Sequence, residues 1–341
     1  MYSYLIGINY KTAPIGAREA VYRKRKELDE FLSGKSFKSA EVLYTCNRIE
    51  VYGLAKDLFE ARVLIGIFCR DFAEFADYGY IRLGEIDVFR HLLRLASGLE
   101  SQIKGEAQIL GQLEEWLSKG HFSTSFYELA HEAILSAKNI RIKSGLGRIN
   151  NNIASVVSCD LLNRIKDQAR PKVIIVGTGK IAELFALNYH WRFDLYFAAH
   201  KNYIKAQELA RRSGGEALEL KELQGRLPEV CALISATSSP HFLFDGDYFL
   251  RATSGREDPL YLYDLAIPRD INPDVEDVSG IILNNLDTLT GVTDEYNQSQ
   301  AINLLLAQEL IEETVRENGK EFYEDSIKDG DTAQPLSYKT N

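Results

Sequence analysis

Cysteine is the most reactive side chain in this sequence, and one of the four cysteines stands among polar residues. Cys46 is surrounded by Thr45, Asn47, Arg48 and Glu50. A thiolate is the best nucleophile that a protein offers near neutral pH, and a nearby cation favours it by lowering the thiol pKa. Cys46 therefore differs from the other three cysteines, and the alternative for it is a buried spectator thiol.

The other cysteines, Cys69, Cys159 and Cys231, stand beside apolar residues and are expected to be small core side chains. No two cysteines are spaced as CxxC, so we predict neither a zinc site nor a disulfide framework, and no metal. Unpaired cysteines are typical of a reducing compartment, which predicts a cytoplasmic protein.

A glycine-rich segment at 172–183 has the pattern of a dinucleotide-binding turn. An apolar strand-like run leads into Gly177-Thr178-Gly179-Lys180-Ile181-Ala182, with alanine in place of the third glycine. Such turns let the amides at the start of the next helix face a pyrophosphate. The motif is weak by itself, and a turn that only packs is the alternative.

The residues after the next strand-like run indicate which cofactor would bind. An NAD enzyme places an acid there, roughly 20 residues after the glycines, for the ribose hydroxyls. Here the run at 195–199 is followed by His200, Lys201 and Asn202. A missing acid and a present lysine favour a 2′-phosphate, so the sequence predicts NADPH.

The elements that must position these residues follow from periodicity. Strand-like runs at 4–9, 41–45 and 49–54, with a helix-compatible run at 17–32, predict a small α+β sheet with Cys46 at a turn. Apolar residues at three- and four-residue spacing over 87–144 predict helices. We expect an N-terminal α+β catalytic domain at 1–148, ending at the break Gly145-Leu146-Gly147.

A second unit and a long helix are expected after that break. A helix at 153–165 and further apolar strands at 232–236 and 261–265 predict a parallel-sheet, Rossmann-like NADPH-binding domain at 149–290. The remainder, 291–341, is expected to hold a long helix at about 294–322 and a tail from Lys328. Two apolar stripes mark this helix, one at Leu304, Ile311, Val315 and Phe322 and the other at Ile302, Leu306 and Leu310. The fold class is thus α/β and multidomain.

Length and charge bound the protein further. With 341 residues, 45% of them hydrophobic, the chain suits two or three domains and is not disordered as a whole. No apolar run approaches the roughly 20 residues that span a bilayer, and the first residues lack secretory-signal features. A net charge of −9 argues weakly against a nucleic-acid partner. However, 11 acidic and 4 basic residues fall in 294–341, whereas 1–150 hold 21 basic and 19 acidic residues.

At Tyr44-Thr45-Cys46-Asn47-Arg48-Ile49-Glu50 the sequence resembles glutamyl-tRNA reductase. Further blocks match that family in order: 7–14 with Arg18 and Glu19, 91–101, 105–112, 234–241 and 264–270. The resemblance spans about residues 5–315. It implies an NADPH-dependent reduction of glutamyl-tRNA to glutamate-1-semialdehyde with release of tRNA, the first step of C5-pathway tetrapyrrole, or porphyrin, biosynthesis.

The resemblance also implies residue roles. Cys46 would form a glutamyl thioester, and His91 would act as a base or an orienting group near the thiol. Residues that would hold the glutamyl group or the tRNA acceptor end are Thr45, Asn47, Arg48, Glu50, Ser101, Glu106, Gln108 and Gln112. Residues that would hold the cofactor are Gly177, Thr178, Gly179, Lys180, Ile181, Ala182, His200, Lys201 and Thr237.

Several of these residues have a structural alternative. Glu50 would pair either with the substrate α-ammonium or with Arg48, and the latter pair could be a surface pair on one strand face. His91 could be a satisfied histidine between helices. Glu106 and Gln108 could simply be residues at the start of a helix, where acids are favourable.

The chain departs from the family pattern in a few places. Tyr10 replaces the usual His of the opening block, and Ala107 replaces the usual Pro. Family members carry a helical dimerisation domain after the long helix, and here we expect it to be truncated. That expectation predicts a weak homodimer or a monomer. The family also implies direct transfer of product to glutamate-1-semialdehyde aminomutase.

Two functions of other classes stay open at this point. A non-catalytic relative would bind tRNA or a partner enzyme as a regulator, although such a module has no need of Cys46 and the glycine-rich turn. An ordinary small-molecule dehydrogenase would turn over its substrate without tRNA.

Overall fold

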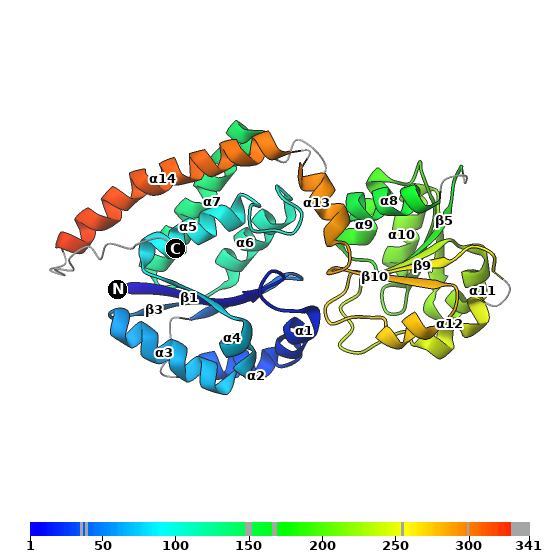
Figure 1. Cartoon of the computed structure of the whole chain (residues 1–341), viewed down its shortest axis with the longest axis horizontal. Coiled ribbons are helices and arrows are strands. Elements are labelled where there is room, and N and C mark those ends of the chain that lie inside the picture. The colour runs from blue at the N-terminus through cyan, green and yellow to red at the C-terminus, as the bar shows by residue number, and fades with distance from the viewer. Residues whose placement is uncertain are drawn as a thin grey trace.

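The computed structural model describes residues 1–34, 37, 40–146, 152–165, 169–253, 256–298 and 300–328. The described residues form two α/β units side by side, with a long C-terminal helix lying over the first (Figure 1). The boundary expected at residues 148 and 149, the predicted break at Gly147 and the tail beyond Lys328 lie outside these residues.

The first unit is built on a four-stranded antiparallel sheet. Its strand order is β2 (Glu41–Tyr44), β3 (Arg48–Ala55), β1 (Tyr2–Asn9) and β4 (Tyr80–Leu83). The predicted strands are therefore confirmed, and Cys46 lies on the turn between β2 and β3. Asn9 pairs with Arg48 in the register, so the end of β1 lies beside this turn.

Helices cover both faces of this sheet, because alternate residues of its strands are apolar on both sides. Tyr4, Ile6 and Ile8 pack with α1 (Ile15–Arg23), α2 (Arg25–Leu32), α3 (Leu58–Asp71) and α4 (Ala73–Tyr78). Leu5 and Tyr52 pack with α5 (Glu85–Ala96), α6 (Gln108–Lys119) and α7 (Thr124–Ser144). The single helix expected at 17–32 is wrong in one respect, since Lys24 leaves the helical region with φ −85° and ψ 9° and separates α1 from α2.

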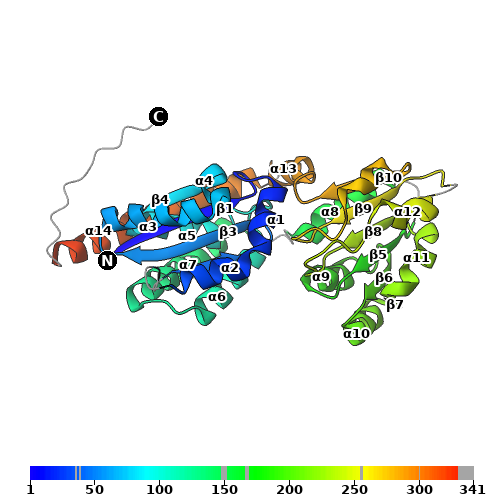
Figure 2. The same cartoon turned by 90° about the horizontal axis from the view of Figure 1, so that it is seen from below.

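The second unit is a doubly wound parallel sheet, as predicted. Its strand order is β10 (Ile281–Asn285), β9 (Leu260–Asp264), β8 (Ala232–Ser235), β5 (Lys172–Val176), β6 (Asp194–Ala199) and β7 (Glu216–Glu219) (Figure 2). The order in which the chain adds strands reverses between β5 and β8: β6 and β7 follow β5 on one side, and β8, β9 and β10 lie on the other. Ligands of such sheets bind at this switch point, beyond the carboxyl ends of the strands.

Each face of the parallel sheet has its own helices. One face carries α8 (Ile153–Arg164), α9 (Lys180–Asn188) and α10 (Tyr203–Ser213). The other carries α11 (Leu223–Arg226) and α12 (Gly246–Thr253). Short 3₁₀ turns, η2 (Leu220–Glu222), η3 (Leu227–Glu229) and η4 (Pro273–Asp277), complete the connections.

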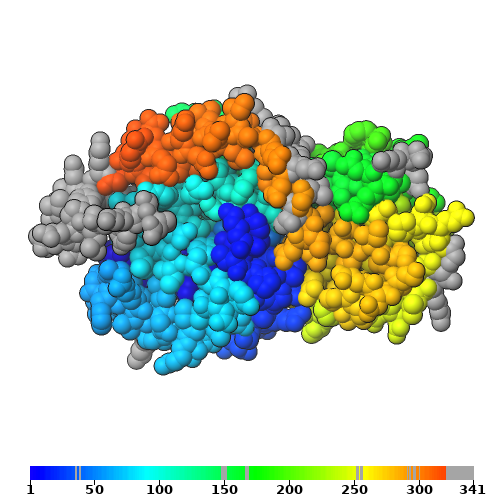
Figure 3. Space-filling model, in the orientation of Figure 1, coloured from blue at the N-terminus to red at the C-terminus, as the bar shows by residue number. Residues whose placement is uncertain are grey.

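The long helix expected at 294–322 is divided in two. It consists of α13 (Thr290–Gln298) and α14 (Ala301–Lys328). Buried Ala307, Ile311 and Val315 pack α14 against the core around α5 and α7, whereas Ile302 of the second expected stripe is 81% exposed. Figure 3 shows α14 lying along the surface of the first unit. In the described part of the chain, no helix has the length and apolar character to cross a membrane.

Candidate active site

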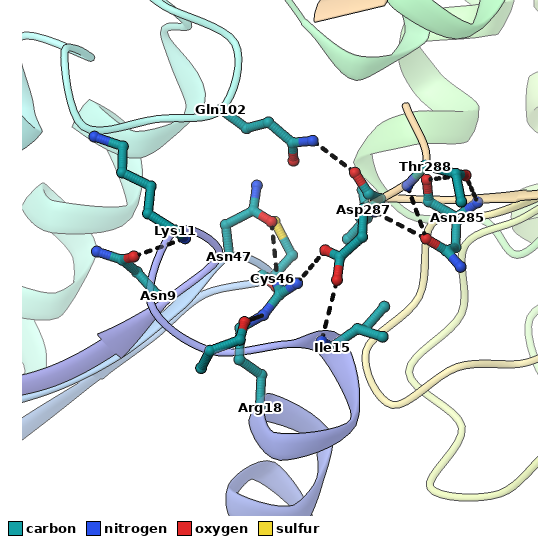
Figure 4. Close-up of polar contacts among 12 residues, drawn as sticks. Asn9, Lys11, Ile15, Arg18, Cys46, Asn47, Gln102, Asn285, Asp287 and Thr288 are labelled. Carbon is teal, nitrogen blue, oxygen red and sulfur yellow. Dashed lines mark hydrogen bonds and ion pairs between the residues drawn. The ribbon is translucent and has the colours of Figure 1, made fainter. Parts of the chain in front are cut away.

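Cys46 lies at the tip of a tight turn, where it is exposed to solvent. The hydroxyl of Thr45 accepts hydrogen bonds from the amides of Asn47 (3.2 Å) and Arg48 (3.1 Å), and these bonds close the turn. From outside the turn, Nη1 of Arg18 donates to the carbonyl oxygen of Cys46 at 3.2 Å (Figure 4). The turn is thus held at the Thr45 hydroxyl and at the Cys46 carbonyl, with Cys46 an exposed residue at its tip.

The surroundings of Cys46 do not lower the pKa of its thiol. The protein atoms around its sulfur and the Glu106 carboxylate raise the pKa of Cys46 to about 11. Arg18 and Arg48 lower this pKa, as expected for nearby cations, but by less. The net direction is therefore opposite to the sequence expectation that nearby cations lower the thiol pKa.

A buried polar network lies behind the turn, centred on Glu50. The Glu50 carboxylate is fully buried and accepts hydrogen bonds from Arg48 Nη1 (2.8 Å), Tyr52 Oη (2.5 Å) and Tyr80 Oη. Burial acts to raise the pKa of Glu50, but His91 and Arg48 hold it well below its usual range. Of the alternatives for Glu50, the structure shows the pair with Arg48. A surface pair is wrong, because both side chains are inside.

His91 belongs to the same network. It is a buried residue of α5, and its Nε2 lies 3.0 Å from Oε1 of Glu50. The buried Arg48 guanidinium has a second hydrogen-bond partner, since its Nη2 donates to the carbonyl oxygen of Glu100 at 2.5 Å. His91 and Arg48 thus both contact Glu50, on the strand that follows the Cys46 turn, and help to fix the position of that strand.

Ser101 and Glu106 lie on a loop that sequence reasoning did not explain. Buried Arg141 of α7 donates to the carbonyl oxygens of Ser97 (3.0 Å), Gly105 (2.8 Å) and Glu106 (2.9 Å), and so fixes both ends of the loop. The loop ends meet at Gly98, which has φ +83° and where a Cβ would lie 2.9 Å from Cα of Gly105. Glycine is needed there for its conformation and its size.

The candidate substrate residues on this loop and on α6 differ in setting. Burial raises the pKa of Glu106, although a hydrogen bond from Ser101 and the charges of Arg48 and Arg141 oppose it. Glu106 lies before α6, so the helix-start alternative is wrong for it. Gln108 does begin α6, and Gln112 follows one turn later.

The glycine-rich turn opens on a cleft of about 630 Å³ at the switch point of the parallel sheet. Six of the predicted cofactor residues line it: Gly177, Thr178, Gly179, His200, Lys201 and Thr237. Lys180, Ile181 and Ala182 belong instead to α9, where Ala182 is buried against the sheet. Lys205 of α10 also lines the cleft. Sequence reasoning missed Lys205, because Lys201 lies before α10 and no helical spacing connects the two lysines.

The geometry of the turn fits a dinucleotide. Gly177 has φ +107°, and a Cβ there would lie 2.6 Å from the carbonyl oxygen of Ala236. Gly179 is the residue directly before α9, and among the described residues no side chain caps the helix there. The first amides of α9 thus remain available for a pyrophosphate, which the positive end of the helix dipole also favours.

Asp270 fixes the opposite wall of the cleft. Its buried carboxylate accepts from Ser235 Oγ (2.7 Å), Thr237 N (3.0 Å) and Thr237 Oγ1 (2.6 Å). Asp264 accepts from the amides of Ala266 and Ile271 in the same loop. The two acids therefore have a structural task at the cleft, which the motif match alone did not reveal.

The remaining cysteines are less uniform than predicted. Cys231 is buried and donates to the carbonyl oxygen of Lys172, Cys69 is half-buried, and Cys159 is exposed. The core assignment of Cys159 is wrong, because it lies on a face of α8 that the sheet does not cover. Within the described ranges, no three His, Cys, Asp or Glu side chains gather as metal ligands would.

The parallel sheet with its glycine turn, joined to a domain that presents a cysteine, defines a nicotinamide-dependent oxidoreductase of the dehydrogenase type. The glutamyl-tRNA reductase of Bacillus subtilis is 31% identical over 332 residues, which cover 93% of this chain and 73% of the relative. This chain belongs to the glutamyl-tRNA reductase family, a family of oxidoreductases.

A second relative and a family model of the N-terminal domain agree with this assignment. The glutamyl-tRNA reductase of Methanococcoides burtonii is 34% identical over 301 residues, covering 84% of this chain and 68% of the relative. The family model described as "Glutamyl-tRNAGlu reductase, N-terminal domain" matches residues 6–144, and "Shikimate / quinate 5-dehydrogenase" matches 160–292. The solved glutamyl-tRNA reductase of Methanopyrus kandleri aligns with a TM-score of 0.49 and 25% identity, over 95% of this chain and 82% of that one.

Proposed function

We propose that this protein reduces glutamyl-tRNA to glutamate-1-semialdehyde with NADPH and releases the tRNA, as the first step of tetrapyrrole biosynthesis in the cytoplasm. The observation that carries the proposal is Cys46, an accessible thiol on a turn that the chain holds from two sides. The family to which the chain belongs supplies the substrate, because its members are named for this tRNA ester.

The first chemical step is acyl transfer to Cys46. The thiolate attacks the ester carbonyl, a C–S bond forms, and the C–O bond to the terminal ribose of the tRNA breaks. The thiol proton ends on the ribose oxygen that leaves. Glu106, whose charge acts on the thiol, is proposed to help hold the glutamyl group or the tRNA acceptor end.

The cofactor residues are proposed from the cleft. The amides that follow Gly177 and Gly179 face the pyrophosphate, His200 and Lys201 take the 2′-phosphate, and Thr237 forms the opposite wall. Hydride, delivered to the acyl carbon, is the chemistry that NADPH supplies when bound. Overall, glutamyl-tRNA, NADPH and one proton give the aldehyde, NADP⁺ and free tRNA.

Direct contacts to the glutamyl group or the tRNA acceptor end are proposed for the candidate residues that take no part in the buried network around Glu50. The proposed set is Thr45, Asn47, Ser101, Glu106, Gln108 and Gln112. Arg48, Glu50 and His91 support the turn through their buried network. This division explains why Arg48, Glu50 and His91 can be buried while Cys46 stays exposed at the turn.

The test is NADPH oxidation with glutamyl-tRNA, compared with uncharged tRNA and with free glutamate. Oxidation is expected only with glutamyl-tRNA, and Cys46→Ser should abolish aldehyde formation. Cys159→Ser is the matched control, because it removes another exposed thiol from a helix of the second unit. Aldehyde formation by Cys46→Ser would refute the thioester.

Two further measurements separate the alternative functions. Turnover of a small molecule without tRNA would identify an ordinary dehydrogenase. Absence of NADPH binding in a fluorescence titration would identify a non-catalytic regulator. Either result would replace the proposed activity.

The assembly is proposed to be a weak homodimer or a monomer. The buried stripe of α14 already packs inside the chain, which leaves exposed residues such as Ile302 and Leu305 for contact with a second copy. Light scattering at micromolar concentration should show mostly monomer, and a tight dimer would contradict this. The α-amino aldehyde product is reactive, so direct transfer to glutamate-1-semialdehyde aminomutase is also proposed. Co-sedimentation of the two proteins tests that transfer.

A further inference from the structure

Helix α1 carries two adjacent charged residues that are both buried. Arg18 is 1% and Glu19 is 2% exposed. Charged side chains are almost never buried to this degree unless they are paired. Each of these two residues pairs with the second unit, and they reach it at different points.

Arg18 joins the Cys46 turn to the connection after β10. Its Nη1 donates to the Cys46 carbonyl oxygen (3.2 Å) and to Asn47 Oδ1 (3.4 Å), while its Nη2 forms an ion pair with Asp287. Asp287 also accepts from the amide of Ile15, at the start of α1, at 3.1 Å (Figure 4). One guanidinium thus contacts the turn that holds the nucleophile and a carboxylate of the second unit.

Glu19 joins the same helix to the wall of the cofactor cleft. Its carboxylate accepts from Arg269 at Nε (3.0 Å), Nη2 (3.0 Å) and the backbone amide (2.6 Å). The next residue, Asp270, holds Thr237 by two hydrogen bonds, and Thr237 lines the cleft. Glu19 is therefore connected to the cleft through its ion pair with Arg269 and through the carboxylate of the next residue, Asp270.

A further contact places both paths at one interface. Buried Gln102 donates to the carbonyl oxygen of Leu286 at 2.6 Å, beside Asp287. In Figure 3 the dark-blue segment around α1 and the orange segment that follows β10 meet at the surface between the units. The turn with Cys46 and the cofactor cleft are thus linked to the same short helix.

The relative placement of the two units matters for the proposed reaction. None of the described residues of the Cys46 turn is among those that line the cleft. Hydride can reach the acyl carbon only if the two reacting atoms are held at near contact, and a misplacement of about 1 Å can cost about 100-fold in rate. Contacts that fix the orientation of one unit against the other therefore bear on the rate.

We propose that Arg18 and Glu19 are positioning residues that couple the Cys46 turn to the cofactor cleft, through Asp287 and Arg269. This inference rests on the proposed function. It adds that NADPH binding in the cleft changes the reactivity of the Cys46 thiol. It also adds that the rate of hydride transfer depends on the two ion pairs more strongly than acyl transfer or cofactor binding does.

The experiment uses the full-length protein and three readouts. They are the rate of Cys46 alkylation by iodoacetamide with and without NADPH, the NADPH dissociation constant from fluorescence, and the rate of aldehyde formation from glutamyl-tRNA. In the wild type, NADPH is expected to change the alkylation rate at least about threefold. Glu19→Gln should lose that change and about 10-fold or more in kcat, with the dissociation constant within about twofold of wild type.

Two further variants keep the test decisive if Glu19→Gln folds poorly. Arg269→Gln alters the more exposed partner of the pair and should reproduce the loss. The charge swap Glu19→Arg with Arg269→Glu should restore part of it, which a general packing defect would not allow. Glu74→Gln is the matched control, since the Glu74–Lys24 ion pair lies within the first unit, and it should behave as the wild type.

The outcomes distinguish the inference from the function on which it rests. The coupling alone would be overturned if the wild type makes aldehyde with NADPH and the Glu19→Gln and Arg269→Gln variants match it. The values that would have to match are kcat and the change in alkylation rate on addition of NADPH. A fall in NADPH affinity that matches the fall in kcat would also overturn it. A wild type without NADPH-dependent aldehyde formation would refute the proposed function.

Discussion

Replacement of Glu50 by Gln is the sharpest test of the buried network behind Cys46. The change keeps the shape of the side chain and removes its charge. It leaves the Arg48 guanidinium, which is 1% exposed, without the negative charge that it faces in the wild type, although the carbonyl oxygen of Glu100 still accepts from it. It also places an amide NH₂ among groups that donate to the carboxylate in the wild type, namely Tyr52 and Tyr80.

The expected loss follows from the burial of the pair. Removing one partner of a buried ion pair costs about 3–5 kcal/mol, because the other charge stays buried without compensation. For a folding unit of 150–250 residues this lowers the unfolding temperature by roughly 6–20 °C. Glu50→Asp keeps the charge but not the reach, so it should lose less than Glu50→Gln.

The assay is urea and thermal unfolding of the full-length protein, followed by far-ultraviolet circular dichroism. Glu115→Gln is the control, because its ion pair with Lys119 lies on the helix surface and its loss should not move the midpoint. A Glu50→Gln variant destabilised by less than about 1 kcal/mol would refute a charged, fully buried Glu50. The Cys46 alkylation rate in the same variant reports whether the turn has shifted.

Three further predictions concern the cleft, pH and α14. Lys201→Ala should raise KM for NADPH about 10- to 100-fold and leave KM for NADH nearly unchanged, because a charged hydrogen bond to the 2′-phosphate is lost. Burial acts to raise the pKa of Glu100, but Lys11 and Arg94 hold it at about 2. The ionised Glu100 carboxylate therefore stabilises the folded protein by at most about 3 kcal/mol. This contribution is fully present above the ordinary carboxyl pKa and is lost as pH falls towards 2. Glu100→Gln should therefore be less stable than wild type at pH 7 and approach it at pH 3 in urea unfolding. Ile311→Ala should destabilise the first unit by about 2–4 kcal/mol in the same measurement.

Each of these three predictions has a result that would contradict it. Equal effects on NADPH and NADH would show that Lys201 does not contact the 2′-phosphate. A stability difference between Glu100→Gln and wild type that is constant from pH 7 to 3 would contradict the lowered pKa of the Glu100 carboxyl. Wild-type stability of Ile311→Ala would contradict the packing of α14 on α5 and α7, and Leu305→Ala, at an exposed position of the same helix, is the control.

Local sequence patterns predicted the elements around both candidate sites. The strand, turn and strand around Cys46 were confirmed, as was the parallel sheet that carries the glycine turn. These patterns work because side-chain alternation and turn chemistry act between near neighbours. The break between α1 and α2 and the exposure of Cys159 were not predicted, because both depend on what the rest of the chain covers.

The sequence by itself determined which residue types are available: a cysteine in a polar motif, a glycine-rich turn and a basic end to the following strand. Tertiary structure alone decided how the charges are used. Arg18 meets Asp287 across 269 residues, and Glu19 meets Arg269 across 250. It also placed Glu50 and Arg48 inside the protein and raised the pKa of the thiol. The physical reason is that burial and ion pairing depend on atoms brought together by the whole fold, whereas local periodicity depends on neighbours in the chain.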